Sequence, residues 1–429
     1  ARRLAQLAME QFERLGDGDG YAYALASVAI ARYHLGQYAA ALAELDARPC
    51  VEDPTCRAAL SFAAYLNYLG LDQLEQAIRA AHCGLHALEY EPREARRIHW
   101  RIVLQRNLVA AYHFRGELAA ARRAGEEAVA LAERHFATEG FYAWSLYELG
   151  LLEQRAGRLD LALTLLQQAR THLEQTTRYD VLWRWILVAQ GHTLRDMGDL
   201  EAADERYRLG GWGEGEDGPL MLWLLQGRYA EARYAAESRL TTGMIESPIE
   251  RTNLGVLLAL LDLEHGAMPE ICERLRAAAE QYQMYGFRYT RASLLLHLAA
   301  AEYELGNTAA ADQPLAEALR FGTAQGYLNF DWWHPERMQR LLHHACAAGI
   351  EPVYSARLLQ ERGLAAPSAS EKAGVTKVMV APDIMPPAMT RLVINCLGQF
   401  RVCIDDEPLP RARWQGYPAG ALRMQRLLV

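Results

Sequence analysis

Three stretches of the chain bring tryptophan, tyrosine or histidine close to arginine. Aromatic rings beside a guanidinium group can stack on a sugar or another planar ligand, or hold an extended peptide. If each stretch is a helix facing one groove, the candidate ligand residues are Arg106, His113, Trp144, Tyr147, Gln154, Arg155, Trp185, His192 and Arg195. The alternative interpretation is that Trp144 and Trp185 are core residues and that the arginines lie on a solvated edge.

Other residues of metal-binding or phosphate-binding type lack the partners that this chemistry needs. His82 and His86 are one helical turn apart, but no third or fourth ligand is close in the sequence. The histidines and cysteine of residues 343–346 are weaker still, because adjacent helical residues point apart. The glycine-rich stretches 16–20 and 211–218 are interleaved with acidic residues, which repel phosphate, and they lack the later acidic positions of an EF-hand loop. We therefore predict interhelical loops there, and no metal site and no cofactor.

No recognisable catalytic motif occurs in the sequence. HExxH, G-x-S-x-G and suitably spaced pairs of carboxylates are absent, so there is no candidate catalytic residue and we predict that the chain is not an enzyme. The phosphate-binding motif G-x-x-x-x-G-K-[ST] is absent too. Any ATPase domain is expected upstream of Ala1.

Composition indicates a folded protein of the cytoplasm. Of the 429 residues, 51% are hydrophobic and 23% are charged, which is globular rather than disordered composition. The net charge of −8 gives no general attraction to nucleic acid or to an anionic membrane. Seven cysteines without a CxxC pair favour free thiols in a reducing compartment. No apolar stretch reaches the length of roughly 18 residues that a membrane span needs. The chain has no signal peptide and does not begin with Met, so we expect a fragment of a longer polypeptide.

A short glycine-containing motif recurs along most of the chain. Its marker glycines are Gly36, Gly70, Gly116, Gly157, Gly198, Gly227, Gly266 and Gly306, and their spacings are 34, 46, 41, 41, 29, 39 and 40 residues. In six of the eight copies an alanine follows five residues later: Ala41, Ala121, Ala162, Ala203, Ala232 and Ala311. Glycine can end a helix in a left-handed conformation, and alanine lets a second helix approach the first closely. The motif therefore predicts a series of paired antiparallel helices.

This pattern resembles the tetratricopeptide repeat (TPR) over roughly residues 20–325. The resemblance implies an all-α solenoid, in which helical hairpins stack into a right-handed superhelix and the first helix of each hairpin lines a concave groove. Two further helices, around residues 335–348 and 352–362, are expected to close the stack. The repeat domain is then residues 1–363, and a proline-containing segment without helical period, residues 364–389, is expected to be a flexible linker.

After the linker the pattern changes from helix to strand. Gly398 and Gln399 separate two short runs rich in β-branched residues, which predicts a β-hairpin. The segment resembles the opening of the winged-helix module in MalT-like bacterial transcriptional regulators of the SARP type, which carry a bacterial transcriptional activator domain. The matching residues are Leu392, Ile394, Leu397, Gly398, Phe400, Val402, Asp405 or Asp406, Pro408, Leu409, Pro410 and Trp414.

That resemblance implies a truncated DNA-binding domain over residues 390–429. Its recognition helix is missing, and Pro418 and Gly420 stand where the family has its first helix, so DNA binding is expected only through a completed domain. The chain is then the sensor segment of a cytoplasmic transcriptional regulator, which binds a peptide or small-molecule effector in its groove and contacts neighbouring domains of a longer polypeptide. The alternative is a stand-alone TPR adaptor that holds a peptide partner.

Overall fold

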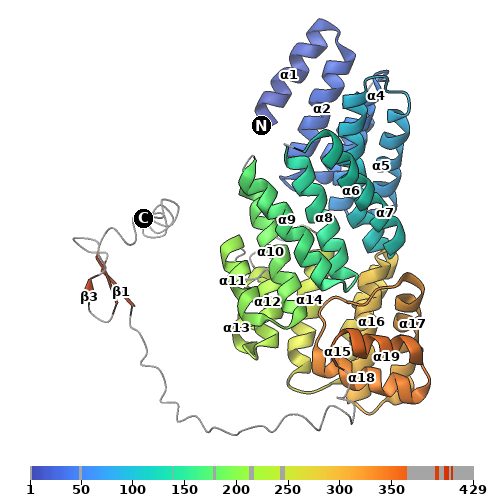
Figure 1. The fold of residues 1–429 in the computed structure, drawn as a ribbon, viewed down its shortest axis with the longest axis vertical. Helices are drawn as coiled ribbons and strands as arrows, with labels where there is room; N and C mark the ends of the chain where they lie inside the picture. The colour runs from blue at the N-terminus through green and yellow to red at the C-terminus, as the bar shows by residue number, and fades with distance from the viewer. Residues whose placement is uncertain are drawn as a thin grey trace. The chain divides into compact units, whose positions relative to one another are not determined.

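The chain divides into a helical unit and a short strand-containing unit, residues 1–366 and 367–429. A computed structural model describes residues 2–47, 51–137, 139–176, 180–211, 217–241, 247–364, 392–395, 401–404 and 407–408. Within the described residues, the first unit consists of nineteen helices and the loops that join them (Figure 1).

The helices follow one another without an intervening strand in the described part of the first unit. They are α1 (Arg2–Leu15), α2 (Gly18–Tyr33), α3 (Tyr38–Asp46), α4 (Pro54–Gly70), α5 (Leu74–Leu88), α6 (Glu94–Arg115), α7 (Leu118–His135), α8 (Gly140–Arg155), α9 (Leu159–Gln175), α10 (Asp180–Met197), α11 (Leu200–Gly210), α12 (Asp217–Leu225), α13 (Tyr229–Thr241), α14 (Pro248–Leu263), α15 (Pro269–Met284), α16 (Arg288–Glu304), α17 (Thr308–Gln325), α18 (Pro335–Ala348) and α19 (Pro352–Glu361).

From α2 onward the helices pack in consecutive pairs, and each pair packs on the next. The first helices of the pairs, from α2 through α4, α6, α8, α10 and α12 to α14, also contact their neighbours in that order. This arrangement confirms the predicted all-helical, TPR-like repeat. The two helices expected after the repeats are α18 and α19, which pack on each other.

All eight marker glycines lie where the first helix of a pair gives way to the second. Seven of them have φ between 72° and 124°, the region in which glycine is favoured. Gly70 is the exception, because it is the last residue of α4 and the left-handed residue of that turn is Asp72, with φ of 59°. Glycine is required at position 70 for another reason: a Cβ atom there would lie 2.4 Å from the Tyr38 ring.

The marker alanines lie in the contact between the two helices of each pair. All six, Ala41, Ala121, Ala162, Ala203, Ala232 and Ala311, have an exposed fraction of 0%. In the second pair, Ala77 follows Asp72 by five residues and is also 0% exposed. The repeat in that pair is therefore shifted by two residues from the position that Gly70 indicated.

The stack curves until helices far apart in the sequence meet. α6 contacts α16, and the Phe114 and Phe287 ring centroids are 5.1 Å apart. On another side, the Asp72 carboxylate accepts hydrogen bonds from the Ser247 hydroxyl (3.3 Å) and the Ile249 amide (3.4 Å) at the start of α14. The first helices of the central pairs therefore enclose a concave surface.

In the second unit, β1 (Leu392–Asn395) pairs antiparallel with β2 (Arg401–Ile404), with Leu392 opposite Ile404. β3 (Glu407–Pro408) pairs antiparallel with β2. The predicted turn at Gly398 and Gln399, the linker after residue 364 and the segment after residue 408 lie outside the described residues. The assignment of these strands to a winged-helix domain stays a prediction.

Candidate functional site

The nine candidate residues lie on three neighbouring helices, α6, α8 and α10. Seven of them line one cavity of about 520 Å³: His113, Tyr147, Gln154, Arg155, Trp185, His192 and Arg195. Arg106 and Trp144 are outside its lining. Residues of α12, α14 and α16 and a non-helical segment after α17 complete the wall.

Arg106 and Trp144 belong to a group of side chains in mutual contact at the edge of the cavity, which we call the aromatic shelf: Arg106, Trp144, Tyr147 and Trp185. The Arg106 guanidinium lies 4.3 Å from the centre of the Trp144 ring, and the Trp144 and Trp185 ring centroids are 5.7 Å apart. Trp185 is 42% exposed, so it is not a core residue. Arg106 is 9% exposed, so it is not on a solvated edge either.

Within the described residues, the Arg106 guanidinium has no hydrogen-bond or ion-pair partner, and its Nε atom is buried. Burial lowers the pKa of Arg106 to about 10. Burial also raises the pKa of the nearby Glu148 carboxyl, whose charge Arg106 favours. The shelf therefore holds a cation that packs on an aromatic ring and has unused hydrogen-bond donors.

A non-helical segment, residues 327–333, lies across the concave surface between α17 and α18, and we call it the crossing segment. It carries no repeat motif, and no structure or function was predicted for it. Unlike an ordinary surface loop, it is enclosed: Tyr327, Leu328, Asn329 and Phe330 are all 6% exposed or less. Its five apolar side chains in seven residues, without a helical period, were the available signal of burial.

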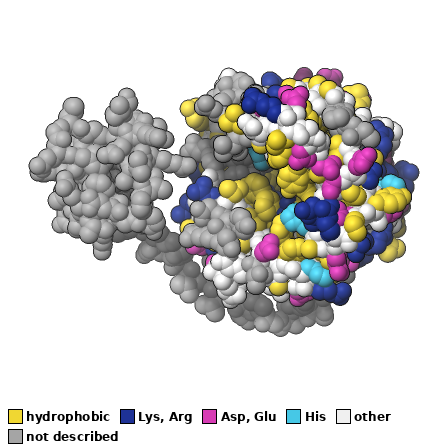
Figure 2. Space-filling view, turned by 90° about the horizontal axis from the view of Figure 1, so that it is seen from above, with side chains coloured by type: hydrophobic (Ala, Val, Ile, Leu, Met, Phe, Trp, Pro, Cys, Tyr) yellow, Lys and Arg dark blue, Asp and Glu magenta, His cyan; other side chains and the backbone are white. Residues whose placement is uncertain are grey.

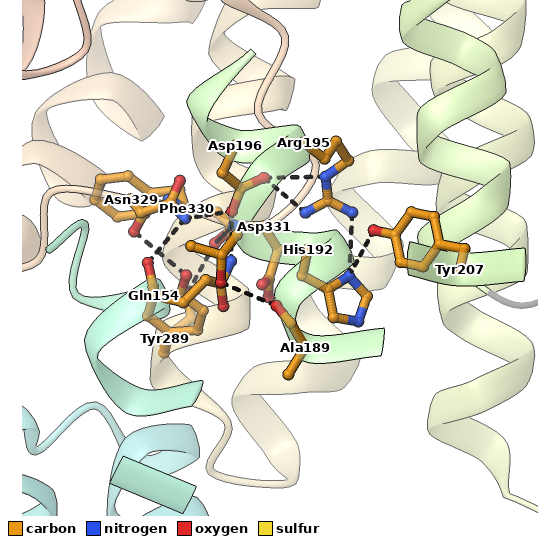
Figure 3. A network of polar contacts seen from close by, with 12 residues as sticks. Gln154, Ala189, His192, Arg195, Asp196, Tyr207, Tyr289, Asn329, Phe330 and Asp331 are labelled. Atoms are coloured by element: carbon orange, nitrogen blue, oxygen red, sulfur yellow. Dashed lines mark hydrogen bonds and ion pairs between the residues drawn. The ribbon is translucent and has the colours of Figure 1, made fainter. Parts of the chain in front are cut away.

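Asp196 is the centre of the polar network that holds the crossing segment (Figure 3). Its carboxylate accepts hydrogen bonds from Arg195 (2.7 Å), from the Asn329 amide (2.8 Å) and from the Gln154 amide. Burial acts to raise the pKa of Asp196, but Arg195 and the other partners outweigh it and the pKa is lowered. Asp196 therefore stays ionised and joins α8, α10 and the crossing segment.

The main chain of the crossing segment is paired by groups distant in the sequence. The Leu328 amide donates to the Ala156 carbonyl at the end of α8 (3.0 Å), and the Tyr289 hydroxyl donates to the Asn329 carbonyl (3.2 Å). The Asp331 amide donates to the Ser293 hydroxyl (3.0 Å). Because buried backbone groups are costly when unpaired, these bonds allow a loop to lie inside the stack.

Arg155 and Asp331 both line the cavity, and they do not form an ion pair with each other. Arg155 has no hydrogen-bond or ion-pair partner among the described residues, and its guanidinium lies 5.3 Å from the Phe114 ring centre. Burial raises the pKa of Asp331 to about 6, and the charge of Arg155 opposes this shift. A polar ligand group that reaches the cavity would find both a donor and an acceptor there.

The two histidines of the candidate set are neutral. Burial, followed by the charge of Arg195, lowers the pKa of His192 to about 3, and its Nδ1 atom is 3.0 Å from the Tyr207 hydroxyl. Burial also lowers the pKa of His113, whose Nδ1 atom is 3.2 Å from the Tyr327 hydroxyl. The Nε2 atom of His113 is buried without a partner among the described residues.

The other residues considered from the sequence are used structurally where the structure describes them. His82 lies 2.7 Å from the Tyr112 hydroxyl, and His86 lies 3.2 Å from Glu89. In the first glycine-rich stretch, Asp17 accepts a hydrogen bond from the Gly20 amide and caps α2. The second stretch falls mostly outside the described residues. Within the described residues, no group of three or more histidine, cysteine or acidic side chains is placed to hold a metal ion.

A second cavity, of about 880 Å³, lies among α1, α2, α4 and α6. Asp19, Asp53, Arg96 and Trp100 are among its lining residues. The Asp53 carboxylate caps α4 and accepts a hydrogen bond from Arg93 (2.6 Å), so its charge is already used. This cavity was not expected from the sequence, because α1 precedes the first repeat.

Viewed from above, the helical unit mixes acidic and basic side chains with hydrophobic ones, and neither sign of charge dominates the visible face (Figure 2). No described helix combines the length and the apolar character that crossing a bilayer requires.

No family model matches the sequence, and no curated protein matches it. Among solved structures, a crystal structure of a Rap protein complexed with Competence and Sporulation Factor is similar over 72% of this chain and 86% of that chain, with 11% identity and a TM-score of 0.55. The apo form of RapI matches 75% of this chain and 97% of that one (12% identity, TM-score 0.33). The Rap conjugation gene regulator of the plasmid pLS20, in complex with the Phr* peptide, matches 80% and 94% (12% identity, TM-score 0.30). The first likeness shows that the helical unit has a TPR-like fold of the Rap kind.

Proposed function

We propose that this chain is a protein-interaction module that binds an extended peptide, or an extended segment of a partner protein, on the concave surface of α6, α8 and α10. In this proposal it binds its ligand and catalyses no reaction. The observation that carries the proposal is that this surface already holds a non-helical segment of the chain, residues 327–329, by main-chain and side-chain hydrogen bonds to all three helices. Peptide recognition commonly uses main-chain bonds for affinity and side-chain pockets for specificity.

The cavity beside the crossing segment offers room for a ligand side chain. Its volume of about 520 Å³ is in the range of small-ligand pockets. Trp185 on its wall is 42% exposed, which gives an aromatic surface for packing. Arg155 and the Nε2 atom of His113 add a donor and a buried polar atom without partners among the described residues.

The likeness of fold supports the same proposal. The Rap protein with a TM-score of 0.55 to this chain was crystallised with Competence and Sporulation Factor. At 11% identity this likeness carries over the fold and no residue of a binding site, so the recognition chemistry has to be read from this chain itself.

A direct test is to titrate a panel of short peptides into the protein and follow its tryptophan fluorescence. We expect a saturable change for part of the panel, because Trp185 lies on the cavity wall. The Trp185→Phe variant should lose most of that change. The Trp223→Phe variant is the matched control, because Trp223 is also partly buried but lies on α12 beside Arg228 and outside the cavity lining. A peptide signal that survives in the Trp185→Phe variant and disappears in the Trp223→Phe variant would place the site elsewhere.

A second candidate function is the transcriptional one, with the same helical unit as its sensor. The observation that favours it is the antiparallel pairing of β1 with β2, in the segment that resembles the start of a SARP-type winged-helix module. In that hypothesis, the ligand binds one of two states of the helical unit more tightly than the other, and the resulting shift changes the curvature of the solenoid or releases a neighbouring domain. DNA is then bound only by a completed C-terminal domain.

The coding sequence on both sides separates the two candidates. A P-loop ATPase upstream of Ala1 and a recognition helix downstream of Val429 would favour the regulator. Stop codons close to both ends would favour the adaptor and remove the regulatory candidate.

A further inference from the structure

The crossing segment is bound as a peptide ligand would be. The Tyr327 hydroxyl donates to the His113 carbonyl (3.3 Å) and lies 3.2 Å from the ring of the same residue. The Leu328 amide donates to the Ala156 carbonyl, and the Asn329 amide donates to the Gln154 carbonyl (3.1 Å) and to Asp196. These partners are more than 130 residues away in the sequence, so the segment binds to a surface that other parts of the chain form.

The helix ends that contact the crossing segment offer mainly hydrogen-bond acceptors. The last carbonyl groups of a helix have no partner within the helix. Ala156 caps the C-terminal end of α8, and its carbonyl accepts the Leu328 amide of the segment that crosses there. The Gln154 carbonyl, in the last turn of α8, accepts from the Gly157 amide (3.0 Å) and also from the Asn329 amide. Asp196 at the end of α10 adds a carboxylate acceptor. A ligand is therefore selected by the donors that it presents.

Gly157 shapes the same surface. A Cβ atom at this position would lie 2.6 Å from the Leu328 Cβ atom and 2.8 Å from its carbonyl carbon. At Gly198, in the equivalent turn of the next pair, an added Cβ atom would have nothing within 4 Å. The close approach of a crossing main chain is therefore specific to the end of α8.

We propose that the C-terminal ends of α6, α8 and α10 form a recognition site for peptides with the pattern Tyr-X-Asn, and that the crossing segment is an internal ligand which a peptide of that pattern replaces. The tyrosine supplies the hydroxyl, the middle residue its main-chain amide, and the asparagine its carboxamide. This inference rests on the proposed peptide-binding function and gives its specificity.

A free peptide has to compete with the internal ligand for the site. A tethered segment acts at a high effective concentration, about millimolar for a short flexible tether, so a free peptide has to compete with it. The segment also holds Trp332 at φ of 57°, a conformation that is costly for a bulky residue. Release of the segment relieves that strain, which favours exchange.

The test uses the full chain and the seven-residue peptide Tyr-Leu-Asn-Phe-Asp-Trp-Trp, blocked at both ends and labelled with fluorescein. Asn329→Asp removes a donor and places a carboxylate against Asp196, so it should release the internal segment. We expect this variant to bind the peptide at least about tenfold more tightly than the unchanged protein. Asn307→Asp is the matched control, because Asn307 also donates to a carboxylate, Glu302 (3.1 Å), but lies away from the site.

Specificity is tested with a peptide of the same composition in which tyrosine and asparagine exchange places. On the Asn329→Asp variant it should bind at least about tenfold more weakly, because it cannot place the tyrosine hydroxyl on the His113 carbonyl and the asparagine carboxamide on the Asp196 carboxylate at the same time. Equal binding of both peptides, or equal binding by all three proteins, overturns the Tyr-X-Asn pattern. If other peptides still quench Trp185 fluorescence, the proposed peptide-binding function stands and only the Tyr-X-Asn pattern is wrong. If no peptide changes the fluorescence, the pattern and the proposed function are both wrong.

A measurement on the unchanged protein covers the case in which Asn329→Asp does not fold. At millimolar peptide, hydrogen exchange of the Leu328 amide should become at least about tenfold faster, since its bond to Ala156 is lost when the segment leaves. Unchanged exchange at Leu328 under these conditions overturns the replacement of the internal ligand.

Discussion

The aromatic shelf and the site of the crossing segment are built from the same helices, with about two to three helical turns between them. At the shelf, Arg106 stacks on Trp144 and has no hydrogen-bond partner among the described residues. At the other site, Arg195 donates to Asp196, which in turn holds Asn329 of the crossing segment. Arg106 is therefore unpaired, whereas Arg195 is paired with a neighbouring carboxylate that also holds the crossing segment.

A TPR-like repeat determines the inward-facing side chains but not what they contact. The repeat fixes which side chains face inward, because its period sets the face of each first helix. It does not determine whether those side chains meet solvent, a partner or another part of the chain. The four predictions below test the two regions against each other by changing one of them at a time.

The largest effect is expected for Asp196→Ala. The change leaves the Arg195 guanidinium, whose side chain is 13% exposed, without its counter-ion, and it frees the Gln154 and Asn329 amides. Breaking a buried pair in this way should lower the free energy of unfolding by about 3–5 kcal/mol. Urea unfolding measures the change. Asp204→Ala, which removes an exposed pair with Arg208, is the control and should cost less than about 1 kcal/mol.

The next effect concerns the close approach at the end of α8. Gly157→Ala and Gly198→Ala both place a side chain at positive φ, 85° and 89°, which should cost each variant about 1–2 kcal/mol. Only Gly157→Ala also pushes against Leu328, and overpacking should add about 1–3 kcal/mol to its loss. Equal losses in the two variants, measured by urea unfolding, would mean that the crossing segment is not held against α8.

The helices that form this site could be predicted from the sequence, but the crossing segment that lies on them could not. The marker glycines and alanines indicated the helix pairs, and counting back from the glycines placed nine side chains on three neighbouring helices. The glycines act locally, within one turn, so sequence spacing is sufficient to find them. In the second pair the predicted turn position, Gly70, is two residues too early, because Asp72 is the residue with the left-handed conformation there.

The crossing segment has no such local signature. Its partners, such as His113 for Tyr327 and Asp196 for Asn329, are separated from it by 214 and 133 residues. No repeat period relates positions at those distances. An apolar stretch without helical period between two helices indicates only that the loop is buried, and the surface that buries it follows from the curvature of the whole stack.

A smaller effect is expected for Asp331, a residue of the crossing segment that lies outside the network around Asp196. Its folded-state pKa is raised to about 6 by burial, whereas the unfolded value is about 4. The folded protein therefore binds the proton more tightly, and this contribution to stability is complete below about pH 4 and is lost as the pH rises through about 6. The Asp331→Asn variant lacks this titration. Its stability relative to the unchanged protein should rise by up to about 2 kcal/mol between pH 4 and pH 7.

Thermal unfolding of both proteins across that pH range measures the difference. The buried histidines, including His192 with its lowered pKa, titrate in the opposite sense, but they are present in both proteins and cancel in the comparison. Parallel stability curves for the two proteins would show that the folded crossing segment does not raise the pKa of Asp331.

The smallest effect is expected at the aromatic shelf, for Arg106→Met. Methionine can keep the contact with Trp144, and the change removes a largely buried cation that has no hydrogen-bond partner in the described part of the chain. The free energy of unfolding should therefore change by less than about 1 kcal/mol. Arg195→Met makes the same substitution in the other region and should cost about 3 kcal/mol or more, because it strands the Asp196 carboxylate. Urea unfolding of both variants gives the comparison directly. A large loss for Arg106→Met would mean that the shelf, too, is a completed structural network, and an unchanged Arg195→Met would mean that the crossing segment is held without it.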